Sequence, residues 1–407
     1  MNASAELALT QTLRSAPRFA RGALQQLKHL QVGELLVTTP EGELLHFRGP
    51  QPGPAAHIVV RDWKAVNAAV RSGDIGVAEA YRDGLIQIDD VTAFLELFVR
   101  NVEALEKLVY GGWLGRIFYW MTHLMRPNTR NGSRKNIHAH YDLGNDFYSL
   151  WLGKSMTYSS ALFEGDHSRG LEAAQDAKYE RILEVIDAKP GERILEIGCG
   201  WGGFAEYAAR TRGVHVHGIT VSQAQLDFAR ARIKKQGLQD LVELTFTDYR
   251  DATGSYDYIV SIEMFEAVGE RYWPTYFKTL HDRLKSGGLA VVQTITIADN
   301  AFDAYRRTSD FIRQYIFPGG MLPCPARFGE LTAAAGLETR GTCAFGLDYA
   351  ETLKRWRHRF NTVENAVDNM GFDHAFRQIW RFYLSYCEAG FRTGRTDVMQ
   401  IELRRQD

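Results

Sequence analysis

The chain has 407 residues, more than one ordinary domain holds, so we expect two domains. Apolar residues make up 45% and charged residues 24%, a globular balance, and the formal net charge of −1 gives the whole molecule no attraction to nucleic acid. The four cysteines (Cys199, Cys324, Cys343 and Cys387) lack metal-ligand spacing, so we expect no metal and no disulfide framework. Signal-peptide and membrane-spanning patterns are also missing. We therefore expect a cytoplasmic protein that at most lies on the inner face of a membrane.

Residues 1–110 predict a small α+β domain without a catalytic constellation. Apolar and polar residues alternate over residues 34–49 around Pro40-Glu41-Gly42, which predicts a hairpin. Residues 62–73 have the pattern of a helix with Asp62 as its N-cap, and further short helical pieces follow.

The segment 111–135 differs in composition from its surroundings. Its first half is rich in Trp, Phe, Tyr, Leu and Met, and all of its charges are basic. This is typical of an interfacial helix followed by a basic linker, and an ordinary packed helix with a solvated linker is the alternative. The basic residues are Arg116, Arg126, Arg130, Arg134 and Lys135.

From about Leu171 onward, strand and helix patterns alternate. This alternation predicts a parallel, doubly wound sheet with helices on both faces, where ligands bind at the carboxyl ends of the strands. The predicted strands are 192–198, 214–220, 242–248, 256–263 and 289–297, and the predicted helices are 201–213, 222–237 and 272–288, the last closed by Gly287-Gly288.

A glycine-rich turn follows the first of these strands. Its spacing, from Gly198 to Gly203, matches the dinucleotide fingerprint G-x-G-x-x-G. A nicotinamide dinucleotide site usually has an acid at the end of the second strand, but that strand ends in Thr220. Glu196 also precedes the turn, giving E-x-G-x-G, and its carboxylate suits a cationic cofactor better than a pyrophosphate. The turn therefore favours the cofactor of methyltransferases.

Five motifs in sequence order resemble the cyclopropane-fatty-acyl-phospholipid synthases and the mycolic acid methyltransferases. The likeness runs from about Asn136 to the C-terminus and, more loosely, over the region before Gly111. The motifs are H-Y-D-L-G-N-D-F-Y at 140–148, M-T-Y-S-S at 156–160, E-I-G-C-G-W-G at 196–202, M-F-E-A-V-G at 264–269 and Y-I-F-P-G-G at 315–320.

The resemblance implies a Rossmann-like class I methyltransferase domain over residues 136–407. It implies S-adenosylmethionine as cofactor, with Thr220 and Gln225 near its ribose and methionine ends and Asp248 near the adenine amino group. The two tyrosines before the sheet would close over the site. The full set of implied cofactor contacts is Tyr141, Tyr158, Glu196, Gly198, Gly200, Thr220, Gln225, Asp248 and Tyr249.

The same resemblance implies a bound bicarbonate as the base that removes a proton after methyl transfer. The chain keeps three of the anion's expected contacts, Glu266, Ile295 and Tyr349. It departs elsewhere: Ser160 replaces a Cys, Gln293 replaces a His, Glu263 stands where the family usually has Gly, and Ala267 where it has His. Two carboxylates so close together would weaken binding of an anion, so either of them is a candidate base in its place.

We therefore expect transfer of a methyl or methylene unit from S-adenosylmethionine to the double bond of an unsaturated acyl chain on a phospholipid, forming a cyclopropane. The alternative is the same transfer ending in a methyl-branched or methylene fatty acid. A nicotinamide-dependent oxidoreductase and a non-enzymatic lipid-binding protein with a decayed site are further alternatives. We expect a phospholipid and a membrane surface as partners, no nucleic acid, and leave a homodimer open.

Overall fold

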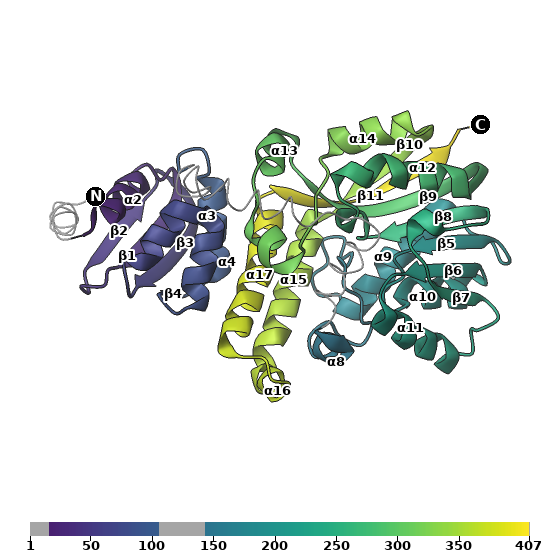
Figure 1. The fold of residues 1–407 in the computed structure, drawn as a ribbon, viewed down its shortest axis with the longest axis horizontal. Helices are drawn as coiled ribbons and strands as arrows, with labels where there is room; N and C mark the ends of the chain where they lie inside the picture. The colour runs from purple at the N-terminus through teal and green to yellow at the C-terminus, as the bar shows by residue number, and fades with distance from the viewer. Residues whose placement is uncertain (1–15, 106–142, 407) are drawn as a thin grey trace. The chain divides into compact units, whose positions relative to one another are not determined.

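The computed structural model describes residues 16–105 and 143–406. The segment 111–135 and Tyr141 lie outside the described residues. The described chain divides into two compact units (Figure 1). The first comprises residues 16–105, 307–316 and 360–395, and the second comprises residues 143–306, 317–359 and 396–406.

The first unit is built on a four-stranded sheet in the order β2-β1-β3-β4. The predicted hairpin is confirmed, because β1 and β2 pair antiparallel with Leu36 opposite His46. The strands are β1 (Val32–Thr38), β2 (Leu44–Arg48), β3 (Gln51–Val60) and β4 (Ile86–Ile88), and the helices are α2 (Arg18–Leu27), α3 (Lys64–Arg82), α4 (Val91–Arg100), α16 (Glu364–Asn369) and α17 (His374–Arg392).

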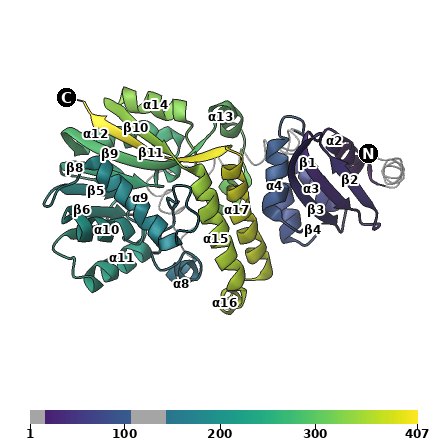
Figure 2. The same cartoon turned by 180° about the vertical axis from the view of Figure 1, so that it is seen from behind.

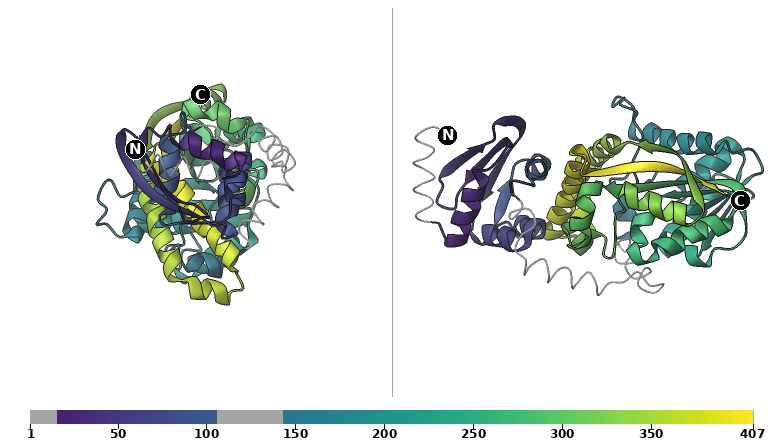
Figure 3. Two further views of the ribbon diagram at one scale, coloured as in Figure 1. Left: turned by 90° about the vertical axis from the view of Figure 1, so that its left-hand side faces the viewer. Right: turned by 90° about the horizontal axis from the view of Figure 1, so that it is seen from above.

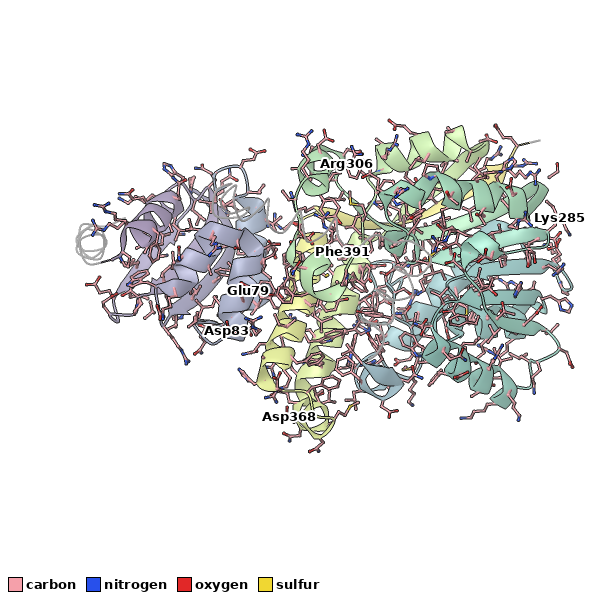
Figure 4. The ribbon with its side chains drawn as sticks, viewed as in Figure 1. Glu79, Asp83, Lys285, Arg306, Asp368 and Phe391 are labelled. Carbon is pink, nitrogen blue, oxygen red and sulfur yellow. The ribbon has the colours of Figure 1, made fainter. Side chains whose placement is uncertain are left out.

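Two details of α3 differ from the sequence prediction. The capping residue is Trp63, although the Asp62 carboxylate still accepts a hydrogen bond from the Lys64 amide at 2.8 Å. The helix also continues beyond Gly73, where a positive φ of 59° marks a kink, because a glycine tolerates that conformation. Distant chain segments complete this unit: α17 packs on α3 and α4, and the Tyr315 hydroxyl donates to Glu79, labelled in Figure 4, at 2.6 Å.

The second unit contains a seven-stranded sheet in the order β10-β11-β9-β8-β5-β6-β7. The five strands from β9 to β7 are parallel, which confirms the predicted doubly wound α/β class. The strands are β5 (Arg193–Ile197), β6 (His215–Thr220), β7 (Val242–Phe246), β8 (Tyr256–Ile262), β9 (Leu284–Ile297), β10 (Leu337–Ala344) and β11 (Thr396–Arg405).

Helices cover both faces of this sheet (Figure 3). Successive strand residues point to opposite faces, so Ile194 of β5 joins one core with α9, α10 and α11, while Leu195 joins the other with α12, α13 and α14. The helices are α8 (Gly144–Ser149), α9 (Leu171–Ile186), α10 (Gly203–Arg212), α11 (Gln223–Lys235), α12 (Trp273–Arg283), α13 (Asp299–Arg306), α14 (Pro325–Ala334) and α15 (Gly346–Thr362).

Two features of the sheet depart from the prediction. Strand β11 pairs antiparallel with both β9 and β10, so the sheet carries an antiparallel addition at one edge (Figure 2). In addition, α12 ends at Arg283 and β9 begins at Leu284, so Gly287-Gly288 lies within the strand and does not close the helix. Within the described residues, no helix is long and apolar enough to cross a membrane.

Two glycines differ in the space that surrounds them, and the pair tests the packing around β6. A Cβ at Gly218 in β6 would lie 2.7 Å from Leu244 Cδ2 and 2.9 Å from Cys199 Cβ. We expect Gly218→Ala to lower the free energy of unfolding by about 1–3 kcal/mol through overpacking.

The matched control is Gly329→Ala in α14, where an added Cβ meets nothing within 4 Å. Alanine there should raise the free energy of unfolding by about 0.5–1 kcal/mol, because it restricts the unfolded chain. Urea unfolding of both variants measures the two effects, and shifts of the same sign would contradict the packing described for β6.

Candidate active site

The predicted glycine turn lies at the carboxyl end of β5. Gly198, Gly200 and Gly202 have φ of 85°, 52° and 79°. A Cβ at Gly198 would lie 2.7 Å from Met264 Cγ, whereas one at Gly200 would meet nothing within 4 Å. Gly198 is therefore required by packing inside the protein, and Gly200 borders open space where a ligand can approach the backbone.

Glu196 supplies a buried carboxylate just before this turn. The residue is 3% exposed and its Oε2 is buried without a hydrogen-bond partner in the structure. Burial raises the pKa of Glu196 to about 8, against the opposing influence of the Arg232 and Lys178 cations. A cationic ligand beside Glu196 would favour its ionised form and gain a partner with an unpaired oxygen, whereas an anionic ligand would gain nothing there.

The residues expected near the cofactor follow the next two parallel strands. Thr220 ends β6, and its hydroxyl donates to Gln225 Oε1 at 3.3 Å, while Ser222 caps α11 by accepting from the Gln225 amide. Asp248 follows β7 and is 5% exposed. Arg250 donates to both Asp248 carboxylate oxygens, at 2.8 and 2.6 Å.

Tyr158 stands in a cluster of aromatic rings. Its ring centroid lies 5.4 Å from that of Tyr148, 5.6 Å from those of Trp151 and Trp356, and 6.4 Å from that of Phe317. Aromatic faces of this kind can stabilise a nearby positive charge. Tyr249 of η1 (Tyr249–Asp251), which follows Asp248 in the chain, has a buried hydroxyl without a hydrogen-bond partner, and burial raises its pKa.

Glu263, directly after β8, has a carboxylate with both oxygens hydrogen-bonded. Its Oε1 accepts hydrogen bonds from the Ser160 amide and from Gln293 Nε2, both at 2.8 Å. Its Oε2 accepts from the Tyr349 hydroxyl at 2.6 Å. The Ser160 hydroxyl points elsewhere and donates to the Ala161 carbonyl, so Ser160 acts through its backbone. Three predicted site residues thus meet on one carboxylate.

The backbone at Glu263 is strained. Its φ is 50°, in the left-handed region where a residue with a Cβ costs roughly 1–2 kcal/mol and glycine costs nothing. This explains on physical grounds why glycine suits the position. A glutamate there accepts the strain in exchange for three hydrogen bonds, which points to a role for its carboxylate.

Glu266 lies close by in η2 (Phe265–Ala267) but is held differently. Its Oε1 accepts from the Thr294 hydroxyl at 2.9 Å and from the Ile295 amide at 2.5 Å, whereas its Oε2 is buried without a partner. Burial, and then the charge of Glu263, raise the pKa of Glu266 to about 8. Burial also raises the pKa of Glu263, but its hydrogen bonds and the Lys178 charge oppose that shift. The surrounding donors therefore favour the charge on Glu263 and the proton on Glu266.

A buried cation, which the sequence analysis missed, compensates these acids. Lys178 of α9 is fully buried and its Nζ donates to Ser159 Oγ at 2.5 Å and to Gln175 Oε1 at 2.7 Å. Burial lowers the pKa of Lys178 to about 7, while the charges of Glu263 and Glu196 raise it. Its burial could have been predicted from its spacing in the sequence, since Lys178 lies four residues from both Ala174 and Ile182, on the apolar face of α9.

The segment from Ser159 to Glu164 is tied to three elements at once. Gln175 of α9 donates to the Ser159 carbonyl at 2.9 Å, and Ser160 donates to Glu263. On α15, Thr352 accepts from the Ala161 amide, and one Asp348 carboxylate oxygen accepts from the amides of residues 163 and 164. These bonds place Tyr158 and Ser160 firmly beside the ends of the strands.

Comparisons with known proteins agree with this site. Residues 128–401 match the family described as mycolic acid cyclopropane synthetase. The tuberculostearic acid methyltransferase UfaA1 of Mycobacterium tuberculosis is 38% identical over 350 residues, 83% of this chain and 80% of the relative. The cyclopropane-fatty-acyl-phospholipid synthase of Escherichia coli K12 is 31% identical over 351 residues, 86% of this chain and 88% of the relative.

Solved structures show the same relationship. The mycolic acid cyclopropane synthase CmaA1, solved in complex with SAH and CTAB, is 28% identical with a TM-score of 0.63, over 67% of this chain and 98% of that one. The cyclopropane synthase MmaA2 from Mycobacterium tuberculosis gives the same identity, TM-score and coverage. The match over residues 128–401, the E-x-G-x-G turn and the buried acids beside it establish that the chain belongs to the mycolic acid cyclopropane synthetase family and is an S-adenosylmethionine-dependent methyltransferase.

Proposed function

We propose that this enzyme adds a one-carbon unit to the double bond of an unsaturated fatty acyl chain on a phospholipid, and that Glu263 is the base that completes the reaction. The observation that carries the proposal is the Glu263 carboxylate, held by Ser160, Gln293 and Tyr349. These are positions at which the family resemblance implies contacts to bicarbonate.

The site around the glycine turn suits S-adenosylmethionine. Gly200 leaves space for a ligand against the backbone, and the unpaired Glu196 Oε2 can accept hydrogen bonds or balance positive charge. Thr220, Gln225 and Asp248 follow the neighbouring strands at the same edge of the sheet. Glu196, Gly198, Gly200, Thr220, Gln225, Asp248, Tyr249 and Tyr158 are accordingly proposed as cofactor-binding residues, with Tyr141 proposed from the sequence alone.

The cofactor site is tested by Gly200→Ala. The methyl group would enter the space left for the ligand, so we expect at least a tenfold loss of S-adenosylmethionine affinity by calorimetry. Gly237→Ala is the matched control: Gly237 also has a positive φ, 68°, and an added Cβ also meets nothing within 4 Å, but it lies at the far end of α11. Equal affinities of the two variants would contradict the assignment.

Bicarbonate does not fit this site. Gln293 and Tyr349 already donate to Glu263, the Ser160 amide does the same, and the Ile295 amide donates to Glu266. An added anion would find these donors occupied and a carboxylate in the space they enclose. We therefore assign the base to the protein itself.

The chemistry requires this base after methyl transfer. S-Adenosylmethionine supplies an electrophilic methyl group, which the alkene's π electrons attack while the carbon–sulfur bond breaks toward sulfur. The acyl chain is then a carbocation, which the aromatic rings around Tyr158 can shelter and stabilise. Glu263 takes a proton from this cation, and the electrons of the broken C–H bond form either a ring bond or a double bond.

The base assignment predicts unequal effects for two glutamine substitutions. Glu263→Gln removes the proton acceptor, so we expect kcat to fall by about 10²–10⁴-fold. Glu266 is protonated at neutral pH because its pKa is raised to about 8, so Glu266→Gln resembles the natural state and should keep most of the rate. Single-turnover rates of the two variants are compared after calorimetry has shown that both bind S-adenosylmethionine with the same affinity. Equal losses in the two variants would contradict the assignment, and a larger loss in Glu266→Gln would move the catalytic role to Glu266.

A rescue experiment tests the replacement of bicarbonate directly. Glu263→Gly relieves the positive φ and frees the Ser160, Gln293 and Tyr349 donors. We expect this variant to be nearly inactive in bicarbonate-free buffer and to regain activity as bicarbonate is added, while the wild-type rate stays constant. A wild-type enzyme that requires bicarbonate would contradict the proposal.

We propose that the product is a methylene-branched chain, with a cyclopropane as the second candidate. Replacement of the residues that hold bicarbonate favours a different outcome from ring closure, and the 38% identical relative is named a methyltransferase. The 31% identical relative, named a cyclopropane synthase, favours the ring. Both products balance with loss of one proton, whereas a saturated branch would need a reductant that this reaction does not supply.

The product is settled by incubating the enzyme with unsaturated phospholipid vesicles and methyl-labelled S-adenosylmethionine. Both candidates gain the mass of one CH2 unit, so NMR must separate a ring CH2 from an exocyclic CH2 carrying alkene protons. We expect the alkene signal.

Vesicles are the appropriate substrate, because we propose a peripheral enzyme at the inner membrane face. This inference depends on the composition of segment 111–135.

A further inference from the structure

Behind Glu263, a chain of buried polar side chains runs away from the site. Gln293 of β9 and Gln400 of β11 are directly opposite each other in the antiparallel pair, and both are fully buried. Gln400 Nε2 donates to Gln293 Oε1 at 3.0 Å, and Gln293 Nε2 donates in turn to Glu263 Oε1 at 2.8 Å.

The far end of this chain is a guanidinium group. Arg181 of α9 donates to Gln400 Oε1 at 2.6 Å and to Glu402 Oε1 at 3.2 Å. Gln400 and Glu402 are two residues apart on β11, so they present their side chains to the same face of the sheet. Arg181 is thus held between two acceptors, with its side chain 23% exposed.

The chemistry of the two ends fixes the direction of every bond between them. A guanidinium can only donate, so Gln400 must turn its oxygen toward Arg181 and its NH2 group toward Gln293. The Lys178 carbonyl, 3.5 Å from Gln400 Nε2, is a second acceptor on that side. Gln293 must then present its oxygen to Gln400 and its NH2 group to the carboxylate.

We propose that Arg181 and Gln400 are positioning residues, which fix the amide of Gln293 so that it always donates to Glu263. The inference rests on the proposed function of Glu263 as the base. Neither residue donates a hydrogen bond to Glu263 itself; both act through Gln293.

The consequence concerns proton affinity. An amide can turn over by exchanging its oxygen and nitrogen, which are nearly equal in size. Without Gln400, nothing holds the Gln293 oxygen away from the site, so the amide can turn and accept a hydrogen bond from a protonated Glu263, which stabilises the neutral acid. The pKa of Glu263, already raised by burial, would rise further, and a larger share of the enzyme would hold a protonated, inactive base.

The test is the pH dependence of kcat/KM in Gln400→Leu. Activity falls as the pH drops through the pKa of Glu263, so the acid limb of the profile reports that pKa. We expect this limb to move to higher pH by about one unit, a tenfold change in proton affinity of the kind that loss of a hydrogen bond to a charged group produces. S-Adenosylmethionine affinity should be unchanged.

Three other titratable groups face Glu263 and remain in place in this variant: Lys178 from α9, Glu266 from η2 and Tyr349 from α15. A shift of the acid limb in Gln400→Leu therefore reports the loss of the amide contact. Lys178→Met is the control: if the two substitutions act independently on Glu263, their shifts of the acid limb add in the double variant.

Arg181 gives a second variant that keeps the test open if Gln400→Leu folds poorly. Arg181→Met should move the acid limb in the same direction, and Arg181→Lys, which still donates, should restore it. Unmoved limbs in Gln400→Leu and Arg181→Met would overturn the positioning role, even with Glu263→Gln inactive. An active Glu263→Gln would instead show that the base assignment itself is wrong.

Discussion

An ionised carboxylate removed from water must be compensated by hydrogen bonds and opposite charge, and the site of this enzyme is organised by that requirement. Glu263 receives three hydrogen bonds from three separate parts of the chain, and the Lys178 cation lies beyond them. The backbone must adopt a left-handed conformation to place the carboxylate there. Strain, hydrogen bonds and charge are therefore concentrated at one residue at the end of β8.

The same requirement separates the roles of the two neighbouring acids. Two ionised carboxylates at short range repel each other, so ionising both costs free energy. The surrounding hydrogen-bond donors decide which of the two carries the charge. Glu263 has both oxygens engaged, whereas Glu266 retains one oxygen without a partner and a pKa raised to about 8. A charge on Glu263 matches its three donors, and a proton on Glu266 neutralises the acid that has fewer. The two glutamates therefore differ in protonation although their side chains are identical.

The sequence predicted the features that depend on local patterns. Strands β5 to β9 follow from runs of apolar residues, and the turn at Gly198 and Gly200 follows from its glycines. The antiparallel β11 was not predicted, because its pairing with β9 joins residues that are about a hundred positions apart and has no local signature. The relay through Arg181 and Gln400 was missed for the same reason. The membership of α17 in the first unit also depends on contacts between segments far apart in the sequence, with α3 and α4.

The hydrogen bonds of the segment from Ser159 to Glu164 have a consequence for the rigidity of the site. Its backbone is hydrogen-bonded to α9, to Glu263 and to α15, so it cannot move away without breaking the bond from the Ser160 amide to Glu263. With Glu263 as the proposed base, movement of this segment would remove one of the three hydrogen bonds that hold its carboxylate, so the rigidity of residues 159–164 and the reactivity of Glu263 depend on the same contacts.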